Sequence, residues 1–366
     1  MKKPMLIFVL LAACFMWAIP VNPAIAQTGE ESTVAQADAE QPKVDAPAEA
    51  ALLFRTHEPL EMTLTANFKA LHKSKTKRSG YHPAVITYND GTGQREMDLR
   101  VRSRGHWRLK NCDMPPVLLN FSKPRTHGTP FENLDRGRLV MHCKNNEEFD
   151  QYVLREYNLY RVWNQLTALS HRARLAKVTY VDSASGTPIT SRYAFILEDD
   201  DAMAERNGGK VLDAQGAKQG DLNSYHDALV GVFQYMVGNV DWSVAGLHNV
   251  ILVNKESDVF ATVYDFDFTG TVKTRYSIPD YRLPIRTVRQ RLFRGYCAPP
   301  EEFEQVFAWF NDRKDAIYAL YTDEIGQLLD PKYREETIKY YDDFYKTIND
   351  RGLARDRIVR SCLTSQ

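Results

Sequence analysis

Residues 239–270 read NVDWSVAGLHN (239–249), VILV (250–253), NKESD (254–258), VFATVY (259–264) and DFDFTG (265–270). Two apolar runs around a short polar break predict a β-hairpin. If Asn254 pairs with Val259, the register places Asn249 opposite Tyr264. Asp265 follows directly, so Asn249 and Asp265 are expected at the same end of the hairpin.

Two more carboxylates are expected at this end. Asp267 lies two positions after Asp265, and Asp241 lies in the loop before the first strand. Such a cluster repels itself unless a cation neutralises it, and hard oxygen ligands suit Mg²⁺ or Mn²⁺. A carboxylate left free of the metal can accept a hydroxyl proton, as in phosphoryl transfer. The alternative is that these residues only form turns and helix caps, which Asp and Asn both favour.

The flanking sequence divides into a strand-rich half and a helical half. Period-two alternation or short apolar runs predict strands at 60–65, 84–88, 97–102, 117–121, 176–181 and 193–197. Period-3.6 patterns predict helices at 149–169, 222–237, 283–296, 301–328 and 331–349. The predicted class is α+β, with a β-rich lobe at 51–198 containing one key helix and a mostly helical lobe at 199–366 that carries the hairpin.

Further motifs accompany the hairpin along the chain. They are VRSRG (101–105), LVM (139–141), LREYNLY (154–160), YAFILED (193–199), GNVDW (238–242), HNV (248–250) and YDFDFTG (264–270). In this order the set resembles the core of the spore-coat protein H (CotH) kinase-like family, an atypical secreted branch of the protein-kinase-like fold. The resemblance spans roughly residues 97–270 and implies a two-lobed protein-kinase-like fold.

The resemblance also implies a role for each site residue. It implies catalysis for Asp241, metal binding for Asn249, Asp265 and Asp267, and nucleotide binding for Glu156, Glu198 and Asp199. Glu156 is expected to pair with the family's phosphate-binding lysine, but the strand position where that lysine is expected holds Asn120. Lys123, Lys110 or Arg104 nearby is a candidate replacement, and we take Lys123 as the nucleotide-binding cation.

The implied activity is a secreted phosphotransferase that uses Mg²⁺ or Mn²⁺ with ATP or another nucleotide. Its acceptor would be a hydroxyl of a protein, a glycan or a small molecule, which the sequence does not identify. The amide at position 120 favours an alternative, a catalytically dead binding or structural protein of the cell envelope. A metal-dependent hydrolase using the same carboxylates is a third hypothesis.

The N-terminus predicts export. Lys2 and Lys3, an apolar run to Ile19 and the AIA ending at Ala26 are typical of a signal peptide at 1–26. Lipid attachment at Cys14 is the alternative. Residues 27–50 lack aromatic side chains and predict a disordered acidic tether. We therefore expect a periplasmic or extracellular protein without a transmembrane helix.

Charge and cysteine content narrow the function classes further. The 47 basic and 47 acidic residues give a formal net charge of zero, which argues against nucleic-acid binding by bulk charge. Four cysteines remain after the signal peptide, and an oxidising compartment favours two disulfides among three possible pairings. We expect Cys112–Cys143 and Cys297–Cys362, which keep each bridge within one half of the chain. Four buried free thiols are the alternative.

Overall fold

Seven strands close into a barrel in the computed structural model, which describes residues 51–73, 80–105 and 107–364. The strands are β1 (Leu60–Ala66), β2 (His82–Asn89), β3 (Gln94–Ser103), β4 (Val117–Asn120), β5 (Arg136–Met141), β6 (Ala173–Asp182) and β7 (Pro188–Leu197). Their order around the barrel is β1-β2-β3-β4-β5-β7-β6. Closure comes from β6, which pairs in parallel with β1, whereas the other neighbouring strands of the barrel are antiparallel.

The prediction of a two-lobed protein-kinase-like fold is therefore wrong. That fold requires an open β-sheet in its first lobe, and here the sheet has no free edge because Leu60 lies opposite Ala176 and the pairing continues to Asp182. The two strands are separated by more than a hundred residues, so alternation within each strand gives no sign that they pair. Barrel closure leaves no unpaired edge strand, which removes a template for aggregation.

Alternate residues of the strands fill the barrel interior. Leu64, Ile86, Val101, Leu119 and Val178 are fully buried, and each comes from a different strand. The remaining positions face outward or pack on other elements, as period-two alternation requires. The predicted strands thus lie where expected, although the sheet that they form was not foreseen.

Along the chain, helices α1 to α4 lie between strands of the barrel, and the other helices follow β7. They are α1 (Phe68–Lys73), α2 (Trp107–Asn111), α3 (Lys123–Thr126), α4 (Glu147–Leu166), α5 (Asp200–Arg206), α6 (Ser224–Val237), α7 (Pro300–Asp312), α8 (Lys314–Ala319), α9 (Pro331–Asn349) and α10 (Arg351–Ala354). A second sheet has the order β10-β9-β8, from β8 (Lys210–Leu212), β9 (Val250–Lys255) and β10 (Asp258–Val263). The predicted helix at 283–296 is absent, because this segment consists of turns whose backbone runs close to α6 at Gly295 and Gly231.

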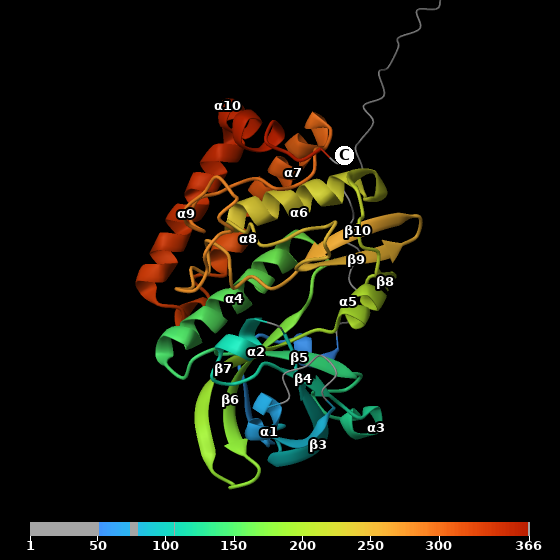
Figure 1. Cartoon of the computed structure of the whole chain (residues 1–366), viewed down its shortest axis with the longest axis vertical. Coiled ribbons are helices and arrows are strands. Elements are labelled where there is room, and N and C mark those ends of the chain that lie inside the picture. Colours follow the sequence, from blue (N-terminus) through green and yellow to red (C-terminus); the bar gives the residue numbers. More distant parts are fainter. Residues whose placement is uncertain (1–50, 74–79, 106, 365–366) are drawn as a thin grey trace, which may run out of the picture. The chain divides into compact units, whose positions relative to one another are not determined.

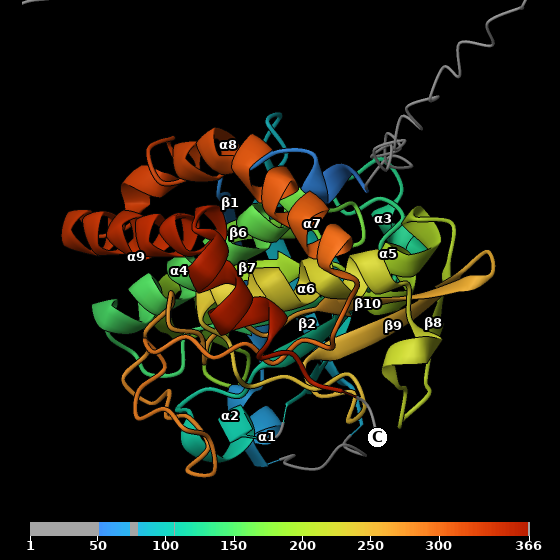
Figure 2. The ribbon, with the colours of Figure 1, turned by 90° about the horizontal axis from the view of Figure 1, so that it is seen from above.

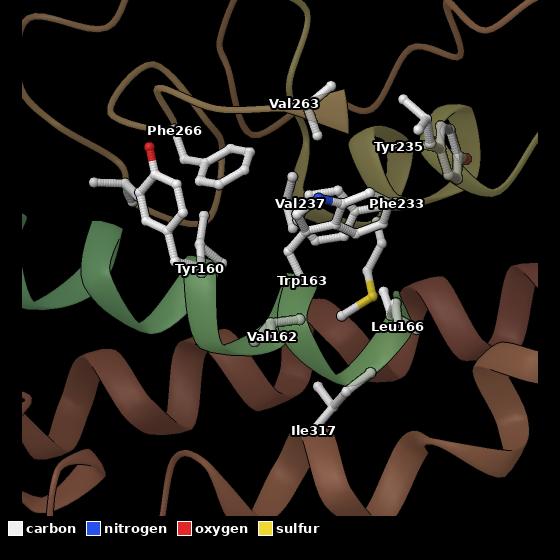
Figure 3. Packing of buried hydrophobic residues seen from close by; sticks show 14 of the residues in the cluster. Tyr160, Val162, Trp163, Leu166, Phe233, Tyr235, Val237, Val263, Phe266 and Ile317 are labelled. Carbon is white, nitrogen blue, oxygen red and sulfur yellow. The ribbon is translucent and has the colours of Figure 1, made fainter. Parts of the chain in front are cut away.

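Helix α4 lies between the barrel and the other helices (Figure 1). Tyr157 contacts Phe195 of β7, with ring centroids 5.8 Å apart. Trp163 stacks on Phe233 of α6 at 4.5 Å, and both side chains point toward each other in Figure 3. Helices α7 and α9 also pack on α6 (Figure 2). One buried helix therefore fixes the barrel and the helical core to each other.

Two disulfides cross-link the chain, and the expected pairing is confirmed. Cys112 and Cys143 have Cα atoms 4.5 Å apart, and Cys297 and Cys362 have Cα atoms 4.8 Å apart. The first joins the end of α2 to the segment after β5. Within the described ranges, no helix combines the length and apolar character needed to cross a membrane. The predicted signal peptide, the tether and Cys14 lie outside the described residues.

Candidate active site

The predicted hairpin and its register are confirmed. Strands β9 and β10 pair with Asn254 opposite Val259. Beyond the last strand pair, the Tyr264 N–H donates to the Asn249 carbonyl at 3.2 Å. Asn249 and Asp265 therefore lie at the same end of the hairpin, as the sequence predicted.

Both residues have unusual backbone conformations. Asn249 has φ of 54° and Asp265 has φ of 63°, in the left-handed region that Asn and Asp tolerate better than other residues with side chains. The Asp265 N–H donates to the Tyr160 hydroxyl of α4 at 2.9 Å. Tyr160 in turn packs on Phe266, with ring centroids 4.8 Å apart (Figure 3). Strained backbone held by buried neighbours is typical of functional sites.

Asp241 is oriented by three hydrogen-bonding neighbours. Its N–H donates to the Asn239 side chain at 2.9 Å. The Asn249 side-chain amide donates to the Asp241 carbonyl at 2.8 Å and to its carboxylate at 3.3 Å. His248 Nε2 lies 2.9 Å from the other carboxylate oxygen, and this hydrogen bond raises the pKa of His248. Asn249 Oδ1 has no hydrogen-bond partner in the described part of the chain and is available to a ligand.

A second group of buried charges lies beside Asp265. Arg108, from the short helix α2, places one guanidinium nitrogen 3.0 Å from Asp267 and 3.3 Å from Glu156 of α4. The other terminal nitrogen donates to the Met141 carbonyl at 3.0 Å. The Tyr276 hydroxyl donates to the Asp267 carboxylate at 3.1 Å. A single cation therefore serves two buried carboxylates.

Burial dominates the protonation of these acids. It raises the pKa of Glu156 to about 8, with Arg108 opposing the shift and Asp267 adding to it. Burial also raises the pKa of Asp265, and repulsion from Asp267 adds to that shift. Arg108 and Arg104 oppose the shift at Asp265, and an added cation would favour its ionised form further.

These groups line one pocket of about 590 Å³. Its polar wall contains Arg104, Arg108, Glu156, Asp241, His248, Asn249, Asp265 and Asp267. Its apolar wall contains Pro116, Val140, Leu197 and Phe268. Arg104 is half-buried, and its guanidinium has no hydrogen-bond or ion-pair partner within the described ranges. Five residues predicted from the sequence thus meet in one cavity with two arginines.

Three other predicted residues lie elsewhere. Glu198 is buried and forms a two-point ion pair with Arg206, with both N–O distances 2.9 Å. Asp199 caps α5 and lies 2.8 Å from Arg136. Lys123 is exposed at the start of α3. None of the three lines the pocket.

Arg108 is a site residue that the sequence did not reveal, and His248 and Tyr276, which contact Asp241 and Asp267, are two others. Arg104 and Lys110, which flank Arg108, were candidate cations for Glu156, but Arg108 itself was not. Helix α2 has only five residues, so its sequence carries too little periodicity to indicate which side chain faces inward. The disulfide at Cys112, directly after this helix, is the one sequence signal for its placement.

A search for metal-binding groups among the described residues and comparisons with known proteins both gave negative results. In residues 51–73, 80–105 and 107–364, no group of three or more His, Cys, Asp or Glu side chains is arranged to hold a metal ion. No protein-family model matches this sequence, and no curated protein matches it either.

Proposed function

We propose that this chain is a divalent-cation-dependent phosphotransferase that moves a phosphoryl group from a nucleotide to a hydroxyl acceptor. The observation that carries the proposal is the convergence of Asp241, Asn249 and Asp265 on a pocket that also holds Arg104 and Arg108. The motif resemblance to the CotH kinase-like family supports the same activity. The two disulfides favour an oxidising compartment outside the cytoplasm.

The oxygen ligands at the hairpin end fit Mg²⁺ or Mn²⁺. Asp265 offers a carboxylate whose ionised form a bound cation would favour, and Asn249 offers an amide oxygen without a hydrogen-bond partner among the described residues. Mg²⁺ is usually held by one or two carboxylates together with substrate phosphates, so a cluster of three acidic ligands is not required. When bound, the cation would offset the charge of the nucleotide phosphates. Asp267 is less available, because Arg108 and Tyr276 already bind it.

The arginines replace the lysine that the sequence lacks at Asn120. Arg108 is held in place by Asp267, Glu156 and the Met141 carbonyl. Arg104 faces the same pocket and can bind phosphate oxygens through its planar fork of N–H donors. Val140 and Leu197 form an apolar wall suited to the base of ATP or another nucleotide. The pocket thus offers apolar contacts for a base and cations for phosphates.

Asp241 is the group that acts on the acceptor. Its carboxylate accepts hydrogen bonds from Asn249 and from His248, which fix its orientation. It accepts the proton of the acceptor hydroxyl as the new O–P bond forms and the bond to the nucleoside diphosphate breaks. The acceptor is a hydroxyl of a protein, a glycan or a small molecule.

The test compares two substitutions in the mature protein. Asp265→Asn should abolish Mg²⁺-dependent nucleotide binding and leave the metal-free protein at least as stable, because it removes repulsion with Asp267. Asp241→Asn should retain binding but lose phosphate transfer. Asp258→Asn, an exposed residue at the far end of the hairpin, is the matched control and should change neither.

Thermal shift with ATP, with and without Mg²⁺, measures binding, and release of nucleoside diphosphate measures turnover. The proposal fails if wild-type protein shows no nucleotide-dependent shift. Nucleotide binding without transfer to any acceptor would favour the alternative of a catalytically inactive binding protein.

A further inference from the structure

A larger cavity of about 860 Å³ lies apart from the candidate active site and shares no lining residue with it. It is formed by α6, α9, Lys273, the segment at 289–293 and the segment at 356–361, which begins in a π-helical turn (Arg355–Val359). Cavities of this volume accommodate small molecules. The phosphotransferase proposal assigns no role to this one.

The lining of this cavity has an excess of positive charge. Its basic residues are Lys273, Arg289, Arg291, Lys339 and Arg357, and its acidic residues are Glu336, Asp343 and Asp356. Each acidic residue is already paired, as Lys273–Glu336 at 3.1 Å, Arg291–Asp343 at 3.0 Å and Arg355–Asp356 at 2.9 Å. Arg289, Lys339 and Arg357 have no carboxylate partner in the part of the chain that the structure describes. These three cations can therefore serve an anionic ligand.

Two of the arginines are held rigidly. Arg289 lies over the Tyr340 ring with its guanidinium carbon 3.9 Å from the ring centroid, and Arg291 does so at 3.6 Å. Only 6% of the Arg291 side chain is exposed. Side chains fixed before binding lose little conformational entropy when a ligand arrives, and a guanidinium matches the two oxygens of a phosphate or carboxylate. Arg289 is thus preorganised for an oxyanion, and Arg291, which is already paired with Asp343, forms a fixed wall beside it.

The cavity backs onto the segments that carry the candidate catalytic residues. Arg289 donates to the Gly270 carbonyl at 3.0 Å. The Gly270 N–H donates to the Gly238 carbonyl at 3.0 Å. Gly238 precedes Asp241 by three residues, and Gly270 follows Asp267 by three residues. A ligand that binds Arg289 therefore acts on the backbone contact that joins both segments.

We propose that this cavity binds a small phosphorylated or carboxylated molecule, and that binding rigidifies the backbone around Gly238 and Gly270. Arg357 and Lys339 at its rim supply the unpaired charge. Arg289, which touches both the ligand and the Gly270 carbonyl, couples the two regions. Ligand binding here does not depend on the phosphotransferase activity proposed above.

The experiment titrates mature protein by calorimetry with glucose 6-phosphate, glucuronate, inorganic phosphate and neutral glucose, all without Mg²⁺. We expect the anions to bind and glucose not to bind. If only glucose 6-phosphate binds, the cavity accepts phosphate esters. If only glucuronate binds, it accepts carboxylates, and if both bind, it accepts either oxyanion. The double variant Lys339→Ala/Arg357→Ala should weaken binding at least about 10-fold, because two charge-assisted contacts are lost.

Two control variants test whether the anion binds in this cavity. Lys332→Ala/Arg351→Ala removes the same charge from exposed positions on α9 and α10 that do not line the cavity, and it should bind as wild type does. Arg104→Ala, which removes a cation of the candidate active site, should also bind the anions as wild type does, which excludes that site as the location.

Hydrogen exchange tests the coupling. The Gly270 and Thr271 amides, which donate to the Gly238 and Val237 carbonyls, should exchange more slowly in the presence of ligand. The proposal is overturned if no anion binds wild-type protein, if the cavity double variant binds as tightly as wild type, or if these amides exchange at an unchanged rate when ligand is bound.

Discussion

Replacement of Arg108 by methionine should destabilise the protein far more than loss of an ordinary surface arginine. Arg108 is the cation that contacts both Asp267 and Glu156, and its side chain is 16% exposed while theirs are 9% and 2% exposed. Methionine preserves much of the packing volume but leaves the Asp267 charge buried without its partner. Removing one member of a buried ion pair typically costs about 3–5 kcal/mol, and we expect a loss in this range.

The assay is urea denaturation at pH 7, with the free energy of unfolding taken from the transition midpoint and slope. Arg125→Met is the matched control, because Arg125 forms an ion pair with Asp98 in which both side chains are more than half exposed. That substitution should cost less than about 1 kcal/mol. The double variant Arg108→Met/Asp267→Asn should regain about 2 kcal/mol relative to Arg108→Met alone, because the buried charge is then removed with its partner.

Two results would refute this reasoning. If Arg108→Met and Arg125→Met destabilise the protein equally, the buried network contributes no more than a surface pair. If Asp267→Asn fails to relieve the Arg108 substitution, the cost arises from packing and not from an uncompensated carboxylate.

Three further predictions concern the scaffold around the site. Replacing Cys112 and Cys143 by serine should lower the free energy of unfolding by about 2–5 kcal/mol. It should also weaken Mg²⁺-nucleotide binding in a thermal-shift assay, because this bridge anchors helix α2. Loss of the disulfide between Cys297 and Cys362 should destabilise the protein without weakening nucleotide binding. Burial lowers the pKa of His226 to about 4, so the unfolded chain binds the proton first as the pH falls below about 6.5. The contribution of His226 to the free energy of unfolding should therefore fall by about 3 kcal/mol between pH 6.5 and 4, and acid denaturation of His226→Gln should lack that part of the slope. Gly238→Ala should lower the melting temperature more than Gly208→Ala, because both glycines have positive φ but a Cβ at Gly238 would also collide with a hydroxyl on α9.

Short-range features of the molecule were predictable from the sequence. The pairing of Asn254 with Val259 follows from two apolar runs and a polar turn, and it determines where Asn249 and Asp265 lie. The disulfide pairs followed from keeping each bridge within one half of the chain. The hairpin depends on neighbours within a few residues, where periodicity and spacing carry the information. The disulfides span 31 and 65 positions, and compartment and cysteine count indicated them instead.

The fold itself depended on contacts that the sequence does not display. The parallel pairing of β1 with β6 closes the barrel, and either strand would show the same alternation in an open sheet. The segment at 283–296 has an apolar pattern compatible with a helix, yet Arg289 and Arg291 donate to backbone carbonyls of other segments and fix it as turns. Tertiary hydrogen bonds outweighed local propensity in this segment.

The position of Arg108 shows why the site was only partly predictable. A five-residue helix is too short to be stable alone, so α2 exists because the rest of the fold holds it. Cys112 ties its end to the segment after β5, and the Arg108 donation to Met141 fixes it to β5 itself. The cation beside Glu156 is therefore supplied by tertiary structure, whereas Asn249 and Asp265 are placed by a local hairpin. Part of this site could therefore be predicted although the predicted open sheet was wrong. Neither the hairpin register nor the anchoring of α2 depends on whether β1 pairs with β6.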